Sequence, residues 1–266
     1  MTEPTGRPTG RVLPAAPSPT GASPTGLVLA AGAGRRYGGP KALARTGSGT
    51  PWLHLAVAAL RAGGCERVVV TLGAGASDAL PLLPPGVEHV VVAGWNEGVA
   101  ASLRHGLTAA GRYGADAVVV VTVDTPTMPA SAVRRIVSAA GPRPADALVQ
   151  AVYDNRPGHP VLIGRDHVPA ITATVTRNIG ARPYLVAKEA LEVECGDLLD
   201  GVDVDGPAPA TARPRRSWRR GRVVAMTSEQ LARARTEELE AEAARERTAL
   251  DDVLDALEEP VQPSRS

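Results

Sequence analysis

Residues 27–41 read LVLAAGAGRRYGGPK and contain the clearest structural signal of the chain. The apolar start of this stretch predicts a short strand that leads directly into a glycine-rich loop. Because glycine has no Cβ, the glycines at 32, 34, 38 and 39 can adopt positive φ angles and bring backbone N–H groups close to a ligand. Arg35, Arg36 and Lys41 place positive charge beside those N–H groups. The stretch therefore predicts a cradle for a polyphosphate.

Two better-known glycine loops do not fit this stretch. The dinucleotide fingerprint needs a third glycine where Tyr37 stands, and an acidic residue about 20 positions further on, whereas no acid occurs between Gly32 and Glu66. The P-loop needs Gly-Lys followed by Ser or Thr, whereas here Pro40 precedes the lysine and an alanine follows it. A plain turn between a strand and a helix is the remaining alternative, and three cations in so short a span weigh against it.

Strand and helix alternate on either side of this loop. Apolar runs predict strands over residues 67–72, 87–93, 116–123 and 147–152, and helices are predicted over 52–62, 102–110 and 129–140. Thr50 is expected to cap the first helix, with Pro51 in its first turn. The alternation predicts an α/β fold with a doubly wound, mostly parallel sheet in three layers (α/β/α), and ligands at the carboxyl ends of the strands. The second half has only short apolar pieces, at 160–163, 184–187 and 191–195, and no topology follows from them.

Composition divides the 266 residues into a globular part and flanking segments. Residues 1–25 are rich in Pro, Thr, Gly and Ser without apolar periodicity, which predicts a disordered leader before a domain over 26–210. The arginines of 211–226 indicate a solvated linker rather than a nucleic-acid contact. A capping box at Thr227 then predicts a charged helix over 227–259, followed by a tail over 260–266. The apolar stripe of that helix would pack on the domain or on another copy of the chain.

Charge, hydropathy and cysteines limit the class of protein further. A net charge of +1 gives no global attraction to nucleic acid or to a membrane. Cys65 and Cys195 lie far apart without metal-site spacing, which indicates buried thiols in a reducing compartment. No apolar run approaches the roughly 20 residues that cross a bilayer. We therefore expect a cytoplasmic protein.

A single acid follows the valine-rich strand of 118–123. Asp124-Thr125-Pro126 would lie at the carboxyl edge of the sheet beside the glycine loop, where Mg²⁺ could be held by one carboxylate together with phosphate oxygens and water. Taken alone, Asp124 could equally cap the next turn. No Ser-His-Asp order, HExxH motif or Cys/His cluster is evident, so hydrolase and zinc chemistry are not supported.

The pattern L-A-A-G-x-G-x-R-x-G-x-P-K resembles the signature of the MobA-like nucleotidyltransferases, and within them the molybdopterin cytidylyltransferase branch. The resemblance covers about residues 26–207 and implies a nucleotide-diphospho-sugar transferase-like fold, with CTP as donor and Mg²⁺ as cofactor. It implies that Arg35 and Lys41 neutralise the phosphates and that Asp124 binds the metal. It places the nucleotide on Leu29, Ala30, Ala31, Gly32, Ala33, Gly34, Arg35, Lys41 and Ser102.

Weaker family-like elements lie further along the chain. Asp203-Val204-Asp205 resembles the D-x-D-T-P element of the family, and we expect Asp205 to be the second metal ligand, with Asp203 and Asp200 as alternatives because Gly206 replaces the usual Thr. Alternation along a strand would put Asp203 and Asp205 on one face.

Two further elements imply contacts with the acceptor. Gly158-His159-Pro160 resembles the G-H-P-V element of the family, and Gly180-Ala181-Arg182 resembles a family triplet. The resemblance implies that His159 and Arg182 contact a molybdopterin-like acceptor. Arg177-Asn178 stands where the family often has an acid, which indicates altered acceptor recognition.

Three hypotheses about function remain open at this point. The first is transfer of a nucleotide to a phosphorylated acceptor in molybdenum cofactor maturation. The second is an NAD(P)H-dependent oxidoreductase of the nicotine blue oxidoreductase type, since proteins of that type share the loop and Arg35 and Arg36 could receive the 2′-phosphate of NADP. The third is a non-catalytic partner in molybdoenzyme maturation that acts through the helix over 227–259; a molybdoenzyme apoprotein is a candidate partner under the first hypothesis.

Overall fold

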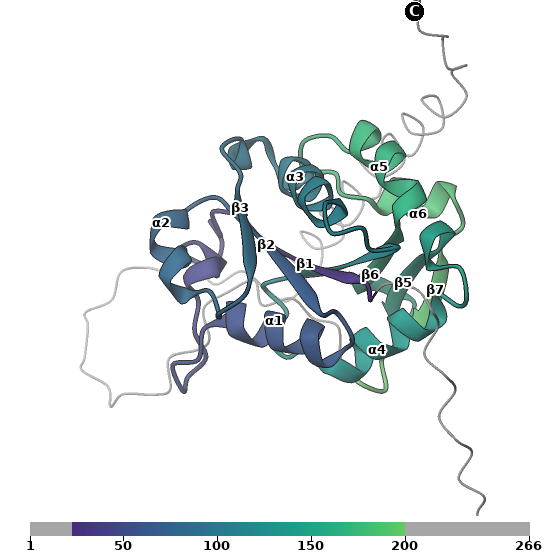
Figure 1. The fold of residues 1–266 in the computed structure, drawn as a ribbon. Coiled ribbons are helices and arrows are strands. Elements are labelled where there is room, and N and C mark those ends of the chain that lie inside the picture. The colour runs from purple at the N-terminus through teal and green to yellow at the C-terminus, as the bar shows by residue number, and fades with distance from the viewer. Residues whose placement is uncertain (1–22, 200–266) are drawn as a thin grey trace, which may run out of the picture.

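A seven-stranded sheet with helices on both faces forms the core of the protein (Figure 1). The structure, a computed structural model, describes residues 23–199. The strands are β1 (Thr25–Ala30), β2 (Arg67–Leu72), β3 (Glu88–Val91), β4 (Ala117–Thr122), β5 (Leu148–Tyr153), β6 (Arg156–Gly164) and β7 (Leu191–Glu194). The α-helices are α1 (Trp52–Ala62), α2 (Ala76–Ala79), α3 (Val99–Gly111), α4 (Ala130–Ala139), α5 (Val168–Thr174) and α6 (Arg182–Ala187).

The strand order is β3-β2-β1-β4-β6-β5-β7, and only β6 runs antiparallel to its neighbours. Helices α3, α5 and α6 cover one face of the sheet, while α1 and α4 cover the other (Figure 1). The predicted three-layer α/β/α fold with a mostly parallel sheet is therefore confirmed.

The valines of β4 show why the sheet is covered on both faces. Val118 and Val120 pack into the core below α3, whereas Val119 and Val121 pack into the core beside α1 and α4. Successive side chains of a strand point to opposite faces, so an unbroken apolar run needs two apolar layers. Both cysteines are buried and unpaired, as expected from the sequence.

Several element boundaries differ from the predictions. β1 begins at Thr25, inside the predicted leader, and β3 is shorter than predicted. Pro51, not Thr50, is the residue before α1, and no side chain caps that helix. Helix α3 begins at Val99, so the predicted start near Ser102 was wrong.

Several predicted segments lie outside the described residues: most of the leader, the arginine-rich linker, the helix over 227–259 and the tail. Within residues 23–199, no helix combines the length and apolarity that crossing a membrane requires.

Candidate functional site

A pocket of about 440 Å³ opens where β1 and β4 end. The two strands are parallel neighbours with Leu29 opposite Thr122, so the segments that follow them leave the sheet side by side. The Val123 N–H donates to the Leu29 carbonyl at 3.1 Å, which fixes the exit of β4 against β1. Ligands of open α/β sheets bind at this kind of edge.

Four segments of the chain line the pocket. They are residues 29–35 with Lys41, then Trp95, Asn96, Gly98, Val99 and Ser102 around the start of α3, then residues 122–124, and Asn178. Each of the nine residues predicted to bind the nucleotide is part of this lining, and so is Asp124.

The glycine loop is closed by a turn that only glycine permits at position 34. Gly34 has a φ of 57°, and its carbonyl accepts the N–H groups of Gly38 at 2.9 Å and Gly39 at 3.1 Å. A Cβ at position 34 would lie 2.0 Å from the Gly39 carbonyl oxygen. Gly38 also has a positive φ, but Gly32 and Gly39 do not, so the prediction was wrong for those two.

An aromatic pair fixes the far side of this turn. The ring of Tyr37 packs on Trp52 at the start of α1, with the ring centroids 5.3 Å apart and the planes at 54°. Tyr37, which stands where the dinucleotide fingerprint would have its third glycine, therefore anchors the loop to α1.

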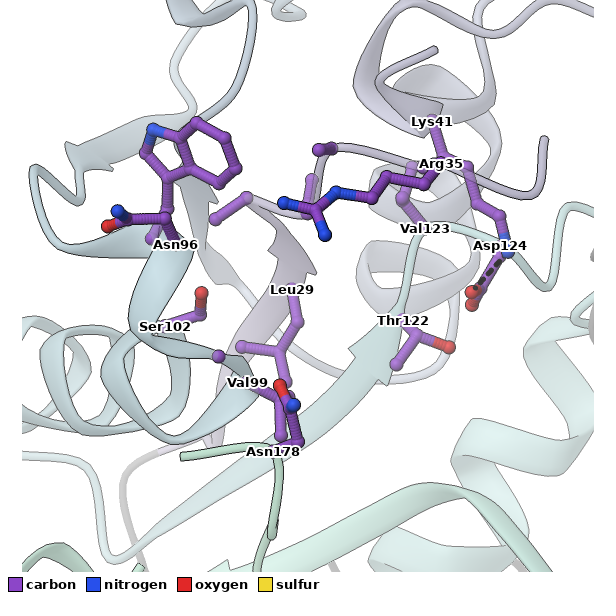
Figure 2. A pocket seen from close by; sticks show the side chains of 17 residues that line it. Leu29, Arg35, Lys41, Asn96, Val99, Ser102, Thr122, Val123, Asp124 and Asn178 are labelled. Atoms are coloured by element: carbon purple, nitrogen blue, oxygen red, sulfur yellow. Dashed lines mark hydrogen bonds and ion pairs between the residues drawn. The ribbon is translucent and has the colours of Figure 1, made fainter. Parts of the chain in front are cut away.

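Lys41 and Asp124 meet inside the pocket although 83 positions separate them in the sequence (Figure 2). The Lys41 ammonium donates to Asp124 Oδ2 at 2.9 Å, and the side chains are 13% and 22% exposed. The other oxygen, Oδ1, is buried and has no hydrogen-bond partner among residues 23–199. The phosphate-loop cation and the acid at the end of β4 are therefore in direct contact.

Arg35 extends its guanidinium into the pocket between Asn96 and Asp124 (Figure 2). Arg36 is exposed and is not part of the lining. Two cations, Arg35 and Lys41, thus face one carboxylate within the described part of the lining, which leaves an excess of positive charge for an anionic ligand.

The opposite wall is the start of α3. Ser102 is buried in that wall, in the first turns of the helix rather than at its N-terminus. Gly98 has a φ of 116°, and a Cβ there would lie 2.3 Å from the Arg177 carbonyl oxygen. That carbonyl accepts the Ala100 N–H at 2.9 Å, so the segment at 177–178 is held against the helix start.

Asn178 belongs to the pocket lining, although Arg177-Asn178 was predicted only to alter acceptor recognition and not to line the nucleotide pocket. Trp95, Thr122 and Val123 were also absent from the predicted set. These three residues could have been predicted only from their closeness in the sequence to Ser102 and Asp124.

The predicted acceptor residues lie outside this lining. His159 is on β6, next to β4, with Nδ1 3.3 Å from the Val120 carbonyl oxygen. Arg182 is the first residue of α6. Asp200, Asp203 and Asp205 lie outside the described residues, so their predicted metal contacts are untested.

The chemistry of Asp124 fits a divalent metal. Mg²⁺ accepts one or two protein carboxylates when phosphate oxygens and water complete its ligands. The buried, unpartnered Oδ1 has the lone pairs that such an ion would take up. A cluster of three or more His, Cys, Asp or Glu side chains is not found between residues 23 and 199.

A glycine turn after β1, an acid after β4 and this strand order define an α/β protein of the nucleotidyltransferase superfamily. The chain belongs to the MobA-like NTP transferase domain family, whose profile matches residues 26–191. Proteins of this family generally use an NTP and a divalent metal.

Three relatives illustrate the similarity. The chain is 35% identical over 190 residues to the nicotine blue oxidoreductase of Paenarthrobacter nicotinovorans, which covers 68% of this chain and 91% of that protein. The crystal structure of Rv0371c from Mycobacterium tuberculosis H37Rv has a TM-score of 0.56 at 27% identity, over 70% of this chain and 94% of that one. A manganese complex of Rv0371C from Mycobacterium tuberculosis H37Rv has a TM-score of 0.51 at 25% identity, over 70% and 91% of the two chains.

Proposed function

We propose that this protein is a Mg²⁺-dependent nucleotidyltransferase that moves NMP from an NTP to a phosphorylated acceptor. The observation that carries the proposal is the contact between Lys41 and Asp124 in one pocket with the Gly34 turn. A phosphate-loop cation and a metal-binding acid must converge on one triphosphate, and these two side chains are already in contact.

The residues of the chain would act by positioning and by neutralising charge. Backbone N–H groups of the loop donate to phosphate oxygens, and Arg35 and Lys41 offset the charge of the departing pyrophosphate. An oxygen of the acceptor phosphate attacks the α-phosphorus of the NTP, and the bond to the β-phosphate oxygen breaks. Asp124 would hold the metal, which when bound polarises phosphoryl oxygens and offsets developing charge.

The substrates follow from the family branch that the loop resembles. We propose CTP as donor and a molybdopterin-like phosphate as acceptor, with His159 and Arg182 on the acceptor side and Asp205 as second metal ligand. The structural relative described as a manganese complex supports a requirement for a divalent ion. A molybdoenzyme apoprotein would then receive the product.

Pyrophosphate release tests the proposal. The protein is incubated with Mg²⁺, each NTP in turn and a molybdopterin-containing fraction, and pyrophosphate is measured. Asp124→Asn keeps the shape of the side chain but removes its charge, so we expect kcat/KM to fall by at least about a hundredfold, since a catalytic metal contributes several kcal/mol.

Asp116→Asn is the matched control. Asp116 precedes the other end of β4 and pairs with Arg165 at 2.6 Å, away from the pocket lining. Its replacement should leave turnover within about twofold because the side chain does not line the pocket, while the loss of the ion pair should cost up to about 1 kcal/mol of stability. Full activity of Asp124→Asn would overturn the proposal.

An oxidoreductase is the second candidate because the 35% identical relative is named nicotine blue oxidoreductase. The absence of a third loop glycine and of an acid before Glu66 weighs against a conventional dinucleotide site. Oxidation of NADPH with a dye acceptor, measured on the same preparation, separates the two. Dye-dependent NADPH oxidation without pyrophosphate release would favour the second candidate.

A further inference from the structure

The ammonium of Lys41 occupies one oxygen of the carboxylate that the proposed metal would need. Lys41 Nζ lies 2.9 Å from Asp124 Oδ2, and both side chains are largely withdrawn from solvent. The backbone around Lys41 is fixed by the Leu43 N–H to the Pro40 carbonyl and by the Ala44 N–H to the Lys41 carbonyl. Only the flexible side chain of Lys41 is therefore able to leave Asp124.

We propose that Lys41 is a built-in competitor of the divalent ion, so that metal and nucleotide enter the pocket together and each binds weakly alone. This inference rests on the proposed function, because it takes Asp124 as the metal ligand. In the nucleotide-free protein the lysine of the phosphate loop pairs with Asp124 instead of a phosphate.

The competition follows from the charges in the pocket. A divalent ion approaching Asp124 without nucleotide meets a positive charge already on Oδ2, and only Oδ1 is unpartnered. Like charges on one carboxylate repel strongly where solvent screening is poor. A metal ion that takes up Oδ1 is therefore repelled by the ammonium on Oδ2 until the ammonium moves to another partner.

A triphosphate supplies that partner. Its oxygens accept hydrogen bonds from the Lys41 ammonium, so Asp124 becomes free to bind the metal ion that accompanies the nucleotide. Nucleotide without metal has the opposite difficulty, because drawing Lys41 away leaves the carboxylate of Asp124 uncompensated beside phosphates of the same sign. The two ligands thus raise each other's affinity, and linkage makes the effect reciprocal.

Binding of Mn²⁺ in the absence of nucleotide tests the inference without any turnover. Free Mn²⁺ is measured by electron paramagnetic resonance with the full chain, its Lys41→Met variant and its Lys188→Met variant. Lys188 is the chain's other lysine and is exposed after α6, so its loss changes net charge equally without touching the pocket. We expect Lys41→Met to bind Mn²⁺ at least about tenfold more tightly than the wild type, which equals about 1.4 kcal/mol, whereas Lys188→Met binds as the wild type does.

The Asp124→Asn change, added to Lys41→Met, should abolish the gain. The inference is wrong if Lys41→Met binds Mn²⁺ no more tightly than the wild type, or if the gain survives in the double variant. Lys41→Gln gives the same readout should Lys41→Met fold poorly, and thermal melting shows which variant to use. Pyrophosphate release by the wild type and by Asp124→Asn is scored separately, so the proposed function can stand when this inference fails.

Discussion

Gly34→Ala should break the phosphate loop more severely than any other single-methyl change in it. The added Cβ would lie 2.0 Å from the Gly39 carbonyl oxygen, whereas ordinary van der Waals contact begins at 3.4 Å, so one of the two must move by about 1.4 Å. The left-handed φ at position 34 adds strain for any residue with a Cβ. The displacement also breaks the two hydrogen bonds that the N–H groups of Gly38 and Gly39 donate to the Gly34 carbonyl.

The expected cost is about 3–4 kcal/mol, from about 1–2 for the backbone strain and about 1 for each of the two lost hydrogen bonds. In a domain of this size that lowers Tm by about 6–16 °C, at about 2–4 °C per kcal/mol. Because residues 32–35 and Lys41 line the pocket, displacing this loop should also raise the dissociation constant for Mg-CTP at least about tenfold, which is about 1.4 kcal/mol.

Gly39→Ala is the control, measured by differential scanning calorimetry and nucleotide titration. A Cβ at position 39 has no neighbour within 4 Å, and the residue is neither in the left-handed region nor in the pocket lining. It should change stability by no more than about 0.5 kcal/mol. If Gly34→Ala melts and binds nucleotide as Gly39→Ala does, a Cβ at position 34 does not clash with the Gly39 carbonyl.

Three further predictions concern the scaffold. Burial raises the pKa of Cys65 to about 12 and also raises the pKa of Cys195, so neither thiol should react with a disulfide reagent at about pH 8 until the protein is unfolded in guanidinium; rapid labelling of the native protein would contradict this. Tyr37→Ala removes the ring that anchors the loop on α1 and should weaken nucleotide binding severalfold with a loss of about 1 kcal/mol in stability, whereas Tyr37→Phe should bind normally. A hydrogen bond from Arg135 holds the pKa of the Asp197 carboxyl below its usual 3.8, so this pair stabilises the fold above that pH and the benefit is lost as pH falls through the lowered value; the Tm gap between wild type and Asp197→Asn should close in acid, and a gap independent of pH would show that the pair contributes nothing.

The first half of the fold could be predicted because its signals are local. The span of α1 and that of β2 match their predicted ranges, since each is bounded by glycine or by a charged turn and has one clear period. The start of α3 was placed three residues late because Gly98, with its positive φ, and not a capping side chain, begins that helix. Nothing in the sequence near Gly98 indicates that the Arg177 carbonyl packs against it.

The second half was not predicted because its strongest signals conflict. Asp154 and Asn155 both have positive φ and form the tight turn of the β5–β6 hairpin, a conformation that these residue types tolerate. Pro157 and Pro160 argue against a central strand, since proline cannot donate to the ladder. β6 nevertheless lies between β4 and β5, and it is the one strand that runs against the others.

The candidate site divides in the same way. The glycine loop and Asp124 could be picked out because each follows an apolar strand, and parallel neighbours end at one edge. The direct contact of Lys41 with Asp124 needed the structure, since nothing in a sequence fixes which of several cations meets an acid 83 positions away. Asn178 needed it too, because only tertiary packing brings that residue to the helix start.

The hydrogen bond between the Ala100 N–H of α3 and the Arg177 carbonyl has a consequence for synthesis of the protein on the ribosome. The loop, the wall of α3 and Asp124 all emerge well before the residue whose carbonyl takes up the Ala100 N–H. A nascent chain that ends before Arg177 contains every residue of the pocket lining except Asn178, but the Ala100 N–H at the start of α3 lacks its acceptor. The wall formed by α3 is therefore completed only once residues 177–178 have been synthesised.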